Sequence, residues 1–332
     1  MKRTLILFLS LFSIVFSSEP SALVIEDVII LGGGIGSLTS ALYLARAGIV
    51  PIVIEGPNPG GLIIQSHSVQ NWPGEMEISG TDLVDKVRKQ VVANGAKLIL
   101  EEVVAVNFSK NPFLITTRKI GEQETRQRLC SNVIIAMGSK PNFLGIPGES
   151  TYWGGGISNC ATCDGALYRG KTVGVVGGGD AAVLEALYLA NIAKEVIVFV
   201  RKDAFSGIEE TRIKALLAKS NVKVRFSTEV KEVKGIKDKL TSVTLKTKDK
   251  PDSDFPLDGL FLAIGSTPNS SLFKGKLELD PQGYIALKNV QETSVQGVYA
   301  IGDIVDPIYK QAITAAGDGA KAALQAERRL SE

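Results

Sequence analysis

Two glycine-rich turns constrain the fold of this chain more than any other feature. Residues 27–31 form a short apolar run that leads directly into the glycines of residues 32–36, and a helical pattern of apolar residues follows. Residues 171–176 and the glycines of residues 177–179 repeat this arrangement. A buried strand, a glycine turn and a helix are typical of a βαβ unit with parallel strands. The sequence therefore predicts an α/β protein with two Rossmann-like, three-layer domains.

The first turn has the features that hold the pyrophosphate of a dinucleotide. Gly32 permits a tight turn, Gly34 lets the backbone approach the pyrophosphate, and the N-terminus of the predicted helix offers free N–H groups. Glu55 ends the next predicted strand, where a carboxylate accepts hydrogen bonds from the hydroxyl groups of an adenosine ribose. We expect an FAD-like or NAD-like nucleotide here, and the alternative is a glycine turn that binds none.

The second turn differs from the first at one informative place. Ala182 occupies its third small position, which fits the dinucleotide fingerprint. The strand predicted at residues 196–200 ends in Arg201 and Lys202 instead of an acid. A basic pair accommodates a ribose 2′-phosphate, so the second unit is predicted to bind NADPH. The alternative is a solvated basic strand end unrelated to any phosphate.

A Cys-x-x-Cys motif lies between the two turns and consists of Cys160 and Cys163, with Asp164 beside the second sulfur. This spacing indicates redox chemistry or half of a zinc site. Zinc would need scattered ligands, because the chain has one other cysteine, Cys130, and one histidine, His67. We therefore expect no metal. A purely structural disulfide would close too small a loop to stabilise much, and Asp164 is the natural proton donor and acceptor for a redox pair.

Composition excludes several classes of partner. Lys and Arg number 37 against 35 acidic residues, so charge indicates neither nucleic acid nor an anionic membrane surface. The apolar fraction of 45% and the charged fraction of 22% are those of a globular protein. Cys130 lies beside an apolar run and is predicted to be a buried small hydrophobe.

Residues 1–24 have the pattern of a targeting segment. A basic start, Met1-Lys2-Arg3, precedes an almost continuous apolar run at residues 5–16. That run is shorter than the ~20 residues needed to span a bilayer as a helix, which favours a signal peptide over a membrane anchor. An exported protein of the bacterial periplasm or the ER lumen follows if the signal is real. The alternative is an uncleaved hydrophobic extension or signal anchor, and a cytoplasmic protein is expected if no signal is present.

The last segments indicate how the chain is divided. Residues 133–138 and 259–265 are similar predicted strands that end in glycine, as expected if each domain ends by returning the chain to its partner. Asp303 lies at the tip of the strand predicted at residues 297–303, ahead of a helical pattern at residues 312–330. By spacing alone Asp303 suits two roles, capping that helix or holding a hydroxyl of a sugar chain.

Together these motifs resemble low-molecular-weight, bacterial-type thioredoxin reductase, a member of the FAD- and NAD(P)-dependent pyridine nucleotide-disulfide oxidoreductases. The resemblance covers about residues 26–330. It rests on both glycine turns, Asn-Trp-Pro-Gly at 71–74, Cys-Ala-Thr-Cys-Asp-Gly at 160–165, and Tyr-Lys-Gln-Ala-Ile-Thr at 309–314. It implies a discontinuous FAD-binding domain at residues 25–140 and 268–332, around an NADPH-binding domain at residues 141–267 that carries the dithiol.

The resemblance also implies the roles of individual residues. Cys163 faces the flavin, Cys160 attacks the disulfide of thioredoxin, and Asp164 is the acid and base. The residues implied to hold FAD are Gly32, Gly34, Gly36, Glu55, Gly61, Asn71, Gly302, Asp303, Lys310, Gln311 and Ala312. Those implied to hold NADPH are Gly177, Gly179, Asp180, Ala182, Arg201 and Lys202. A homodimer is implied, as is alternation between two domain orientations about hinges near residues 138–142 and 265–269.

Four positions depart from the family pattern. Leu62 replaces a glutamine near the flavin, Ser266 replaces a histidine, and Lys310 replaces an arginine. Ser206 stands where a further arginine usually follows the basic pair. The 2′-phosphate therefore has fewer cationic partners, which predicts a weaker preference for NADPH over NADH.

The leading hypothesis is NADPH-dependent reduction of the disulfide of thioredoxin, or of a thioredoxin-like protein, through FAD and the Cys160/Cys163 couple. One alternative is an exported FAD-dependent dithiol oxidase of the same fold, which passes electrons to oxygen. The intact second turn with Arg201 and Lys202 argues against it. The other alternative is a flavin-bound, non-catalytic interaction module, which the retained dithiol disfavours.

Overall fold

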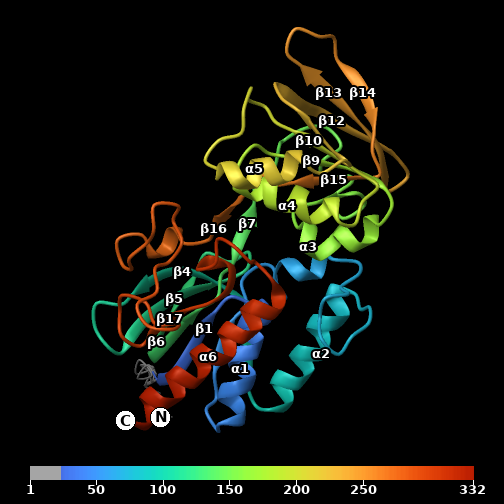
Figure 1. Cartoon of the computed structure of the whole chain (residues 1–332). Coiled ribbons are helices and arrows are strands. Elements are labelled where there is room, and N and C mark those ends of the chain that lie inside the picture. The colour runs from blue at the N-terminus through green and yellow to red at the C-terminus, as the bar shows by residue number, and fades with distance from the viewer. Residues whose placement is uncertain (1–23) are drawn as a thin grey trace, which may run out of the picture.

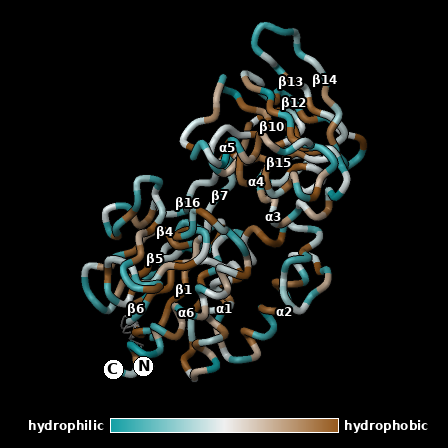
Figure 2. Tube along the Cα trace, in the orientation of Figure 1, coloured by the Kyte–Doolittle hydropathy of each residue, from teal (hydrophilic) through white to brown (hydrophobic). Residues whose placement is uncertain are grey.

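The computed structural model describes residues 24–332. Residues 1–23 of the predicted targeting segment therefore lie outside the described residues. Figure 1 shows two lobes joined by the strands β7 (Ser139–Pro141) and β16 (Ser266–Pro268). Hydrophobic segments concentrate in the strands of both lobes, and hydrophilic segments lie in the peripheral loops (Figure 2). Within the described residues, no helix has both the length and the apolar character needed to cross a membrane.

The first lobe is built on a seven-stranded sheet whose order is β3-β2-β1-β6-β5-β4, with β17 also paired to β6. Its strands are β1 (Ile25–Leu31), β2 (Ile52–Ile54), β3 (Lys97–Ile99), β4 (Glu101–Asn107), β5 (Phe113–Lys119), β6 (Thr125–Ile135) and β17 (Val298–Ala300). β1 is parallel to β2 and β6, and β17 is parallel to β6, whereas β4 and β5 continue the sheet in antiparallel fashion. The C-terminal part of the chain thus completes a sheet begun by the N-terminal part.

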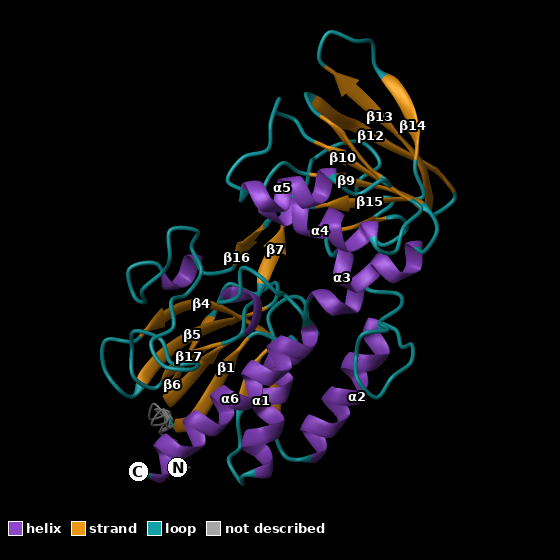
Figure 3. Ribbon diagram, viewed as in Figure 1, coloured by secondary structure: helices purple, strands orange, loops and turns teal. Residues whose placement is uncertain are grey.

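Three helices, α1 (Ile35–Arg46), α2 (Gly80–Ala93) and α6 (Ala312–Ser331), cover one face of this sheet (Figure 3). Val28 and Ile30 of β1 pack against them, whereas Ile29 and Leu31 pack in a second cluster on the opposite face. Alternate residues of a strand point to opposite faces, so an unbroken apolar run is buried on both sides. The α/β class and the parallel strand predicted at the first turn are therefore confirmed.

The second lobe has a parallel sheet of order β11-β10-β9-β15-β8. These strands are β8 (Ile157–Ser158), β9 (Thr172–Val176), β10 (Glu195–Phe199), β11 (Val222–Arg225) and β15 (Gly259–Leu262). Helices α4 (Asp180–Ala190) and α5 (Glu210–Leu217) pack on one face. An antiparallel sheet of β12 (Thr228–Ile236), β13 (Lys239–Thr247) and β14 (Ser253–Pro256) packs on the other. The result is the expected three layers.

Short elements complete the chain and place functional residues at the edges of the two lobes. They are α3 (Ala161–Asp164), η1 (Leu62–Gln65), η2 (Gly165–Tyr168), η3 (Ser271–Phe273) and η4 (Gly302–Ile304). Between the lobes, β7 and β16 pair antiparallel, with Ser139 opposite Pro268 and Pro141 opposite Ser266. The two segments expected to form the hinges therefore lie side by side as one two-stranded connection.

Helices α1 and α6 approach each other closely because both carry glycine at the contact. Ser40 of α1 donates a hydrogen bond of 3.0 Å to the carbonyl oxygen of Gly319 in α6. A Cβ atom added to Gly319 would lie 2.3 Å from the carbonyl oxygen of Gly36, whereas one added to Gly317 would meet nothing within 4 Å. The contact matters for function because α1 begins at the first glycine turn and α6 begins beside the disulfide described below.

We expect Gly319→Ala to lower the free energy of unfolding by about 1–3 kcal/mol, because the added methyl overpacks the α1–α6 contact. Gly317→Ala is the matched control on the same helix, and it should raise stability by up to ~1 kcal/mol through helix propensity. Urea unfolding followed by circular dichroism measures both changes. Equal stability of the two variants would contradict the close approach.

Candidate active site

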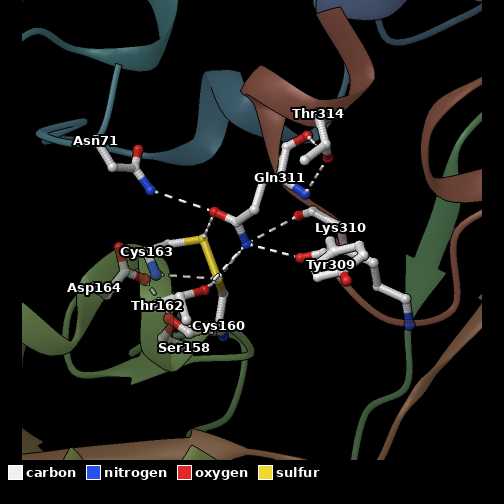
Figure 4. Close-up of a disulfide and its surroundings, with 10 residues drawn as sticks. All are labelled: Asn71, Ser158, Cys160, Thr162, Cys163, Asp164, Tyr309, Lys310, Gln311 and Thr314. Atoms are coloured by element: carbon white, nitrogen blue, oxygen red, sulfur yellow. Dashed lines mark hydrogen bonds between the residues drawn. A yellow bond between two sulfur atoms is a disulfide. The ribbon is translucent and has the colours of Figure 1, made fainter. Parts of the chain in front are cut away.

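Cys160 and Cys163 form a disulfide at the boundary between the two lobes (Figure 4). Cys160 is the N-cap residue of α3, and its sulfur accepts a hydrogen bond of 3.1 Å from the backbone N–H of Cys163. An N–H aimed at a sulfur favours the thiolate form of that cysteine after reduction. Among residues 24–332, no group of three or more His, Cys, Asp or Glu side chains has the arrangement of a metal site.

Gln311 reaches the disulfide from the first lobe. Its amide nitrogen donates to the Thr162 hydroxyl at 3.0 Å and lies 3.6 Å from the Cys160 sulfur, and its amide oxygen lies 3.8 Å from the Cys163 sulfur. Asn71 donates to the same amide oxygen at 3.4 Å. Two of the residues expected to hold FAD, Asn71 and Gln311, therefore contact each other, and Gln311 lies beside both sulfurs (Figure 4).

The position of Gln311 is fixed by its role at the start of α6. It is the N-cap residue of that helix and forms a capping box with Thr314. This arrangement satisfies free N–H groups at the start of the helix and fixes the backbone that carries the side chain. Thr162 is a contact that the sequence analysis missed, although its place inside the Cys-x-x-Cys motif was a usable signal.

Asp164 is the titratable group beside the disulfide. Burial raises its pKa, and a hydrogen bond from Ser158, 2.6 Å from the Ser158 hydroxyl to the carboxylate, partly opposes that rise. The Ser158 hydroxyl also accepts the backbone N–H of Cys160 at 3.0 Å. Ser158 thus connects the acid to the first cysteine, and it was not among the predicted site residues.

A small cavity of about 120 Å³ lies next to Asp164 between the lobes. His67 of the first lobe and Trp153, Ser158 and Tyr168 of the second are among its lining residues. The Trp153 ring N–H donates to the Gln65 side chain at 3.2 Å, which adds a polar contact between the lobes. The cavity is large enough to hold water beside the carboxyl group.

The first glycine turn has the shape expected of a pyrophosphate site. A Cβ at Gly32, whose φ is +113°, would lie 2.3 Å from the carbonyl oxygen of Ala136, so only glycine fits there. Gly34, the N-cap residue of α1, has nothing within 4 Å of its Cβ position, and Gly61 lies against it. The backbone is therefore open at the helix N-terminus, and these residues fit the diphosphate of FAD.

Glu55 lies at the end of β2, as predicted, and is buried. Arg88 of α2 binds both of its carboxylate oxygens, with 3.2 Å between the second guanidinium nitrogen and Oε2. This bidentate pair fixes the orientation of the carboxylate at the tip of the strand. Arg88 was missed, because a helix-to-strand contact across 33 residues leaves no local sequence pattern.

Asp303 lies in η4 and does not cap α6, so the structure rejects the capping alternative. Burial raises its pKa, and Ser139 of β7 donates a hydrogen bond of 3.3 Å to its carboxylate. Gly302 has a φ of +68°, and Ala312 is the first residue of α6. Lys310 donates to the Ser266 hydroxyl at 2.5 Å, so two of the positions that depart from the family pattern contact each other between the first lobe and the β7–β16 connection.

The second glycine turn opens on a larger cavity of about 560 Å³. Gly177, Gly179, Arg201 and Lys202 line it, together with Ser206. The other two residues expected to hold NADPH do not line it. Asp180 is held by Arg212, 2.6 Å from guanidinium nitrogen to carboxylate oxygen.

Ala182, the second exception, is fully buried, and its methyl lies only 2.8 Å from the Cβ position of Gly177. Its small size therefore serves the packing of helix on strand. Cys130 is fully buried as well, and burial raises the pKa of its thiol to about 12. The prediction that Cys130 is a packed small hydrophobe is confirmed.

We expect Ser158→Ala to raise the pKa of Asp164 further, because the substitution removes the hydrogen bond that stabilises the carboxylate. Infrared difference spectroscopy of the oxidised protein, referenced to Asp164→Asn, would follow the carboxyl band and show titration at higher pH. Thr162→Ala is the control, since that hydroxyl contacts Cys160 and Gln311 and should leave the titration unchanged. Titration at the same or lower pH in Ser158→Ala would contradict the assignment.

Comparison with known proteins places this site in a family. The model of the pyridine nucleotide-disulphide oxidoreductase family matches residues 26–319. The chain is 41% identical to a thioredoxin reductase of Coxiella burnetii over 316 residues, which cover 92% of this chain and 96% of the relative. It is 39% identical to a glucosaminate ammonia-lyase of Pseudomonas fluorescens, with 91% and 95% of the two chains covered.

Among solved structures, the thioredoxin reductase from Giardia duodenalis is similar, with a TM-score of 0.86 and 37% sequence identity. That similarity covers 92% of this chain and 98% of the other. The sequence match and the shared fold both extend over the two glycine turns and the disulfide between them. The chain belongs to the pyridine nucleotide-disulphide oxidoreductase family.

Proposed function

We propose that this chain is an NADPH-dependent thioredoxin-disulfide reductase that uses FAD and the Cys160–Cys163 disulfide. The observation that carries the proposal is the position of that disulfide, which lies against Gln311 and near Asn71 of the first lobe. FAD, when bound, accepts a hydride from NADPH and delivers an electron pair to a disulfide. The first glycine turn, Glu55 and the open backbone at Gly34 fit its adenosine diphosphate.

Cys160 and Cys163 have different roles in the reaction with the protein substrate. Two electrons and two protons convert the Cys160–Cys163 disulfide into two thiols. The thiolate of Cys160 attacks one sulfur of the substrate disulfide, forms a mixed disulfide and releases the other substrate sulfur as a thiolate. Cys163 then attacks the Cys160 sulfur, which releases the second substrate thiol and restores the original disulfide.

Asp164 supplies and removes the protons in these exchanges. Burial raises its pKa, which favours the protonated form that a proton donor needs. Ser158 orients the carboxyl group and accepts the N–H of Cys160, so acid and nucleophile are held together. We assign the nucleophile to Cys160 because its sulfur receives an N–H, and the flavin-facing role to Cys163.

The dithiol and the residues around it favour one activity among those named for relatives of this chain. The ammonia-lyase of Pseudomonas fluorescens shows that relatives of this chain bear more than one activity name. Here a disulfide, an adjacent acid and a cavity lined by a basic pair occur together, which favours the reductase. A dithiol oxidase would not need Arg201 and Lys202 at the second turn.

We assign residues 25–140 and 268–332 to the FAD domain and residues 141–267 to the NADPH domain. The pairing of β17 with β6 supports this division, since it joins residues 298–300 to residues 133–135. The disulfide packed against Gln311 is suited to receive electrons, whereas a protein partner needs it exposed. We propose that the β7–β16 connection lets the lobes reorient between these two tasks, and that the enzyme is a homodimer.

We also propose that residues 1–24 are a signal peptide, so that the partner is a thioredoxin-like protein of the bacterial periplasm or the ER lumen. The basic start and the short apolar run support it. Mass determination of the N-terminus of the protein purified from its own cells tests this. Recovery of an intact Met1 would favour an uncleaved extension.

Anaerobic mixing with NADPH tests the electron path. We expect loss of the visible absorption of bound flavin and, after denaturation, two more reactive thiols per chain than in the untreated protein. Thioredoxin disulfide added afterwards should restore the flavin spectrum. A flavin that stays oxidised would contradict the reductase assignment and favour the oxidase.

We expect Cys160→Ser to lower thioredoxin reduction by at least about 1,000-fold, because it removes the attacking sulfur. NADPH should still bleach the flavin, since that step does not require Cys160. Cys130→Ala is the control, because that thiol is buried away from the dithiol and should leave the thioredoxin rate unchanged. A Cys160→Ser protein that keeps its thioredoxin activity would reverse the assignment.

A further inference from the structure

The cavity at the second glycine turn contains a cation that the basic pair does not account for. Lys231 of β12 lines it together with Arg201 and Lys202. We propose that Lys231 binds the ribose 2′-phosphate of NADPH and replaces the cation that is missing at Ser206, which makes it a determinant of specificity against NADH. This inference rests on the proposed use of NADPH and names one more residue of that site.

The backbone places the start of β12 directly beside the basic pair. The N–H of Ser227 donates to the carbonyl oxygen of Lys202 at 2.9 Å, and the N–H of Thr228 donates to that of Val200 at 3.0 Å. These two bonds lie on either side of Arg201. Lys231 follows Thr228 by three residues, a distance of about 10 Å along an extended strand. Its long side chain can therefore reach back toward the phosphate that Arg201 and Lys202 are proposed to bind.

A β-bulge directs Lys231 to the cavity. In the pairing of β12 with β13, Val230 lies opposite Leu245 and Glu232 lies opposite Thr244, which leaves Lys231 as an extra residue without a partner. Val230 and Val233 are buried in the core between the two sheets. Bulges are common next to binding sites, where they change the direction of a side chain. Here Lys231 lines the cavity, while Val230 and Val233 of the same strand stay buried.

The charges in the cavity are consistent with an anion. Three cations, Arg201, Lys202 and Lys231, share the lining with one acid, Glu229. Lys231 lies 3.7 Å from the Glu229 carboxylate, with both side chains nearly half exposed. Exposed pairs of this kind contribute little stability, so a doubly charged phosphate competes for the lysine easily. Lysine suits this role because its flexible stem carries a compact charge.

Ser206 itself has little to offer the phosphate. Its backbone N–H already donates to the carbonyl oxygen of Gly178 at 2.9 Å, which leaves only a neutral hydroxyl. A hydroxyl can donate one hydrogen bond to a phosphate, but it brings no positive charge, whereas a lysine provides both a donor and a charge. Among the described residues that line this cavity, Lys231 is the third cation beside Arg201 and Lys202.

Binding of 2′,5′-ADP to the FAD-loaded protein tests the inference without catalysis, because this molecule carries the ribose 2′-phosphate and lacks nicotinamide. We expect Lys231→Gln to weaken its binding, measured by titration calorimetry at fixed ionic strength, by about tenfold. Binding of 5′-AMP, which lacks the 2′-phosphate, should not change. Lys234→Gln is the matched control on the same strand, since Lys234 pairs with Asp254 at 2.9 Å and does not line the cavity.

Glu229→Gln provides a test in the opposite direction. Removal of the competing carboxylate should tighten 2′,5′-ADP binding severalfold, and it should do so only while Lys231 is present. In steady-state assays, Lys231→Gln should raise the KM for NADPH and leave the KM for NADH unchanged. Equal 2′,5′-ADP affinity in Lys231→Gln and wild type would overturn the inference, whereas a wild-type protein that binds no 2′,5′-ADP would overturn the proposed use of NADPH itself.

Discussion

Gln311 connects the first lobe to the disulfide carried by the second, and the rest of the site depends on that contact. Its hydrogen bond to Thr162 is the one short bond among its contacts with the Cys-x-x-Cys turn. A bond of this kind contributes only about 1 kcal/mol net. The helix cap holds Gln311 rigidly, but the disulfide is held only weakly against it. A dithiol that must first receive electrons and then meet a protein needs this combination of accurate placement and easy release.

The glycines of the first lobe serve the same placement. Gly32 allows the turn to approach Ala136, and Gly36 and Gly319 let α1 and α6 pack backbone to backbone. Because α1 begins at the nucleotide turn and α6 begins at Gln311, the close contact fixes the distance between the nucleotide site and the residue that meets the disulfide. Side chains of ordinary size at these positions would separate the helices and move both ends of the path.

Local patterns in the sequence predict local structure, and here they predicted both βαβ units, the acid and basic strand tips and the dithiol. They did not predict Arg88 on Glu55, Ser158 on Asp164 or Lys231 at the second turn. Arg88 and Lys231 are brought in by the packing of a separate helix or strand, which periodicity does not encode. Ser158 is near in sequence, but its role depends on the turn geometry. Asp180 and Ala182 do not line the cavity, because one is paired with Arg212 and the other is buried between helix and strand. Their role toward NADPH stays a prediction.

The charged residues at the ends of β2 and β10 differ not only in sign but also in whether they are already paired. Glu55 is already bound by Arg88, yet a carboxylate has about four acceptor sites, so a fixed and partly occupied acid can still receive ribose hydroxyls. Arg201 and Lys202 are exposed, and neither takes part in an ion pair within residues 24–332. Their charge remains available for a phosphate. We therefore expect the two βαβ units to suit different nucleotides, because the charge is already paired in one unit and stays free for an anion in the other.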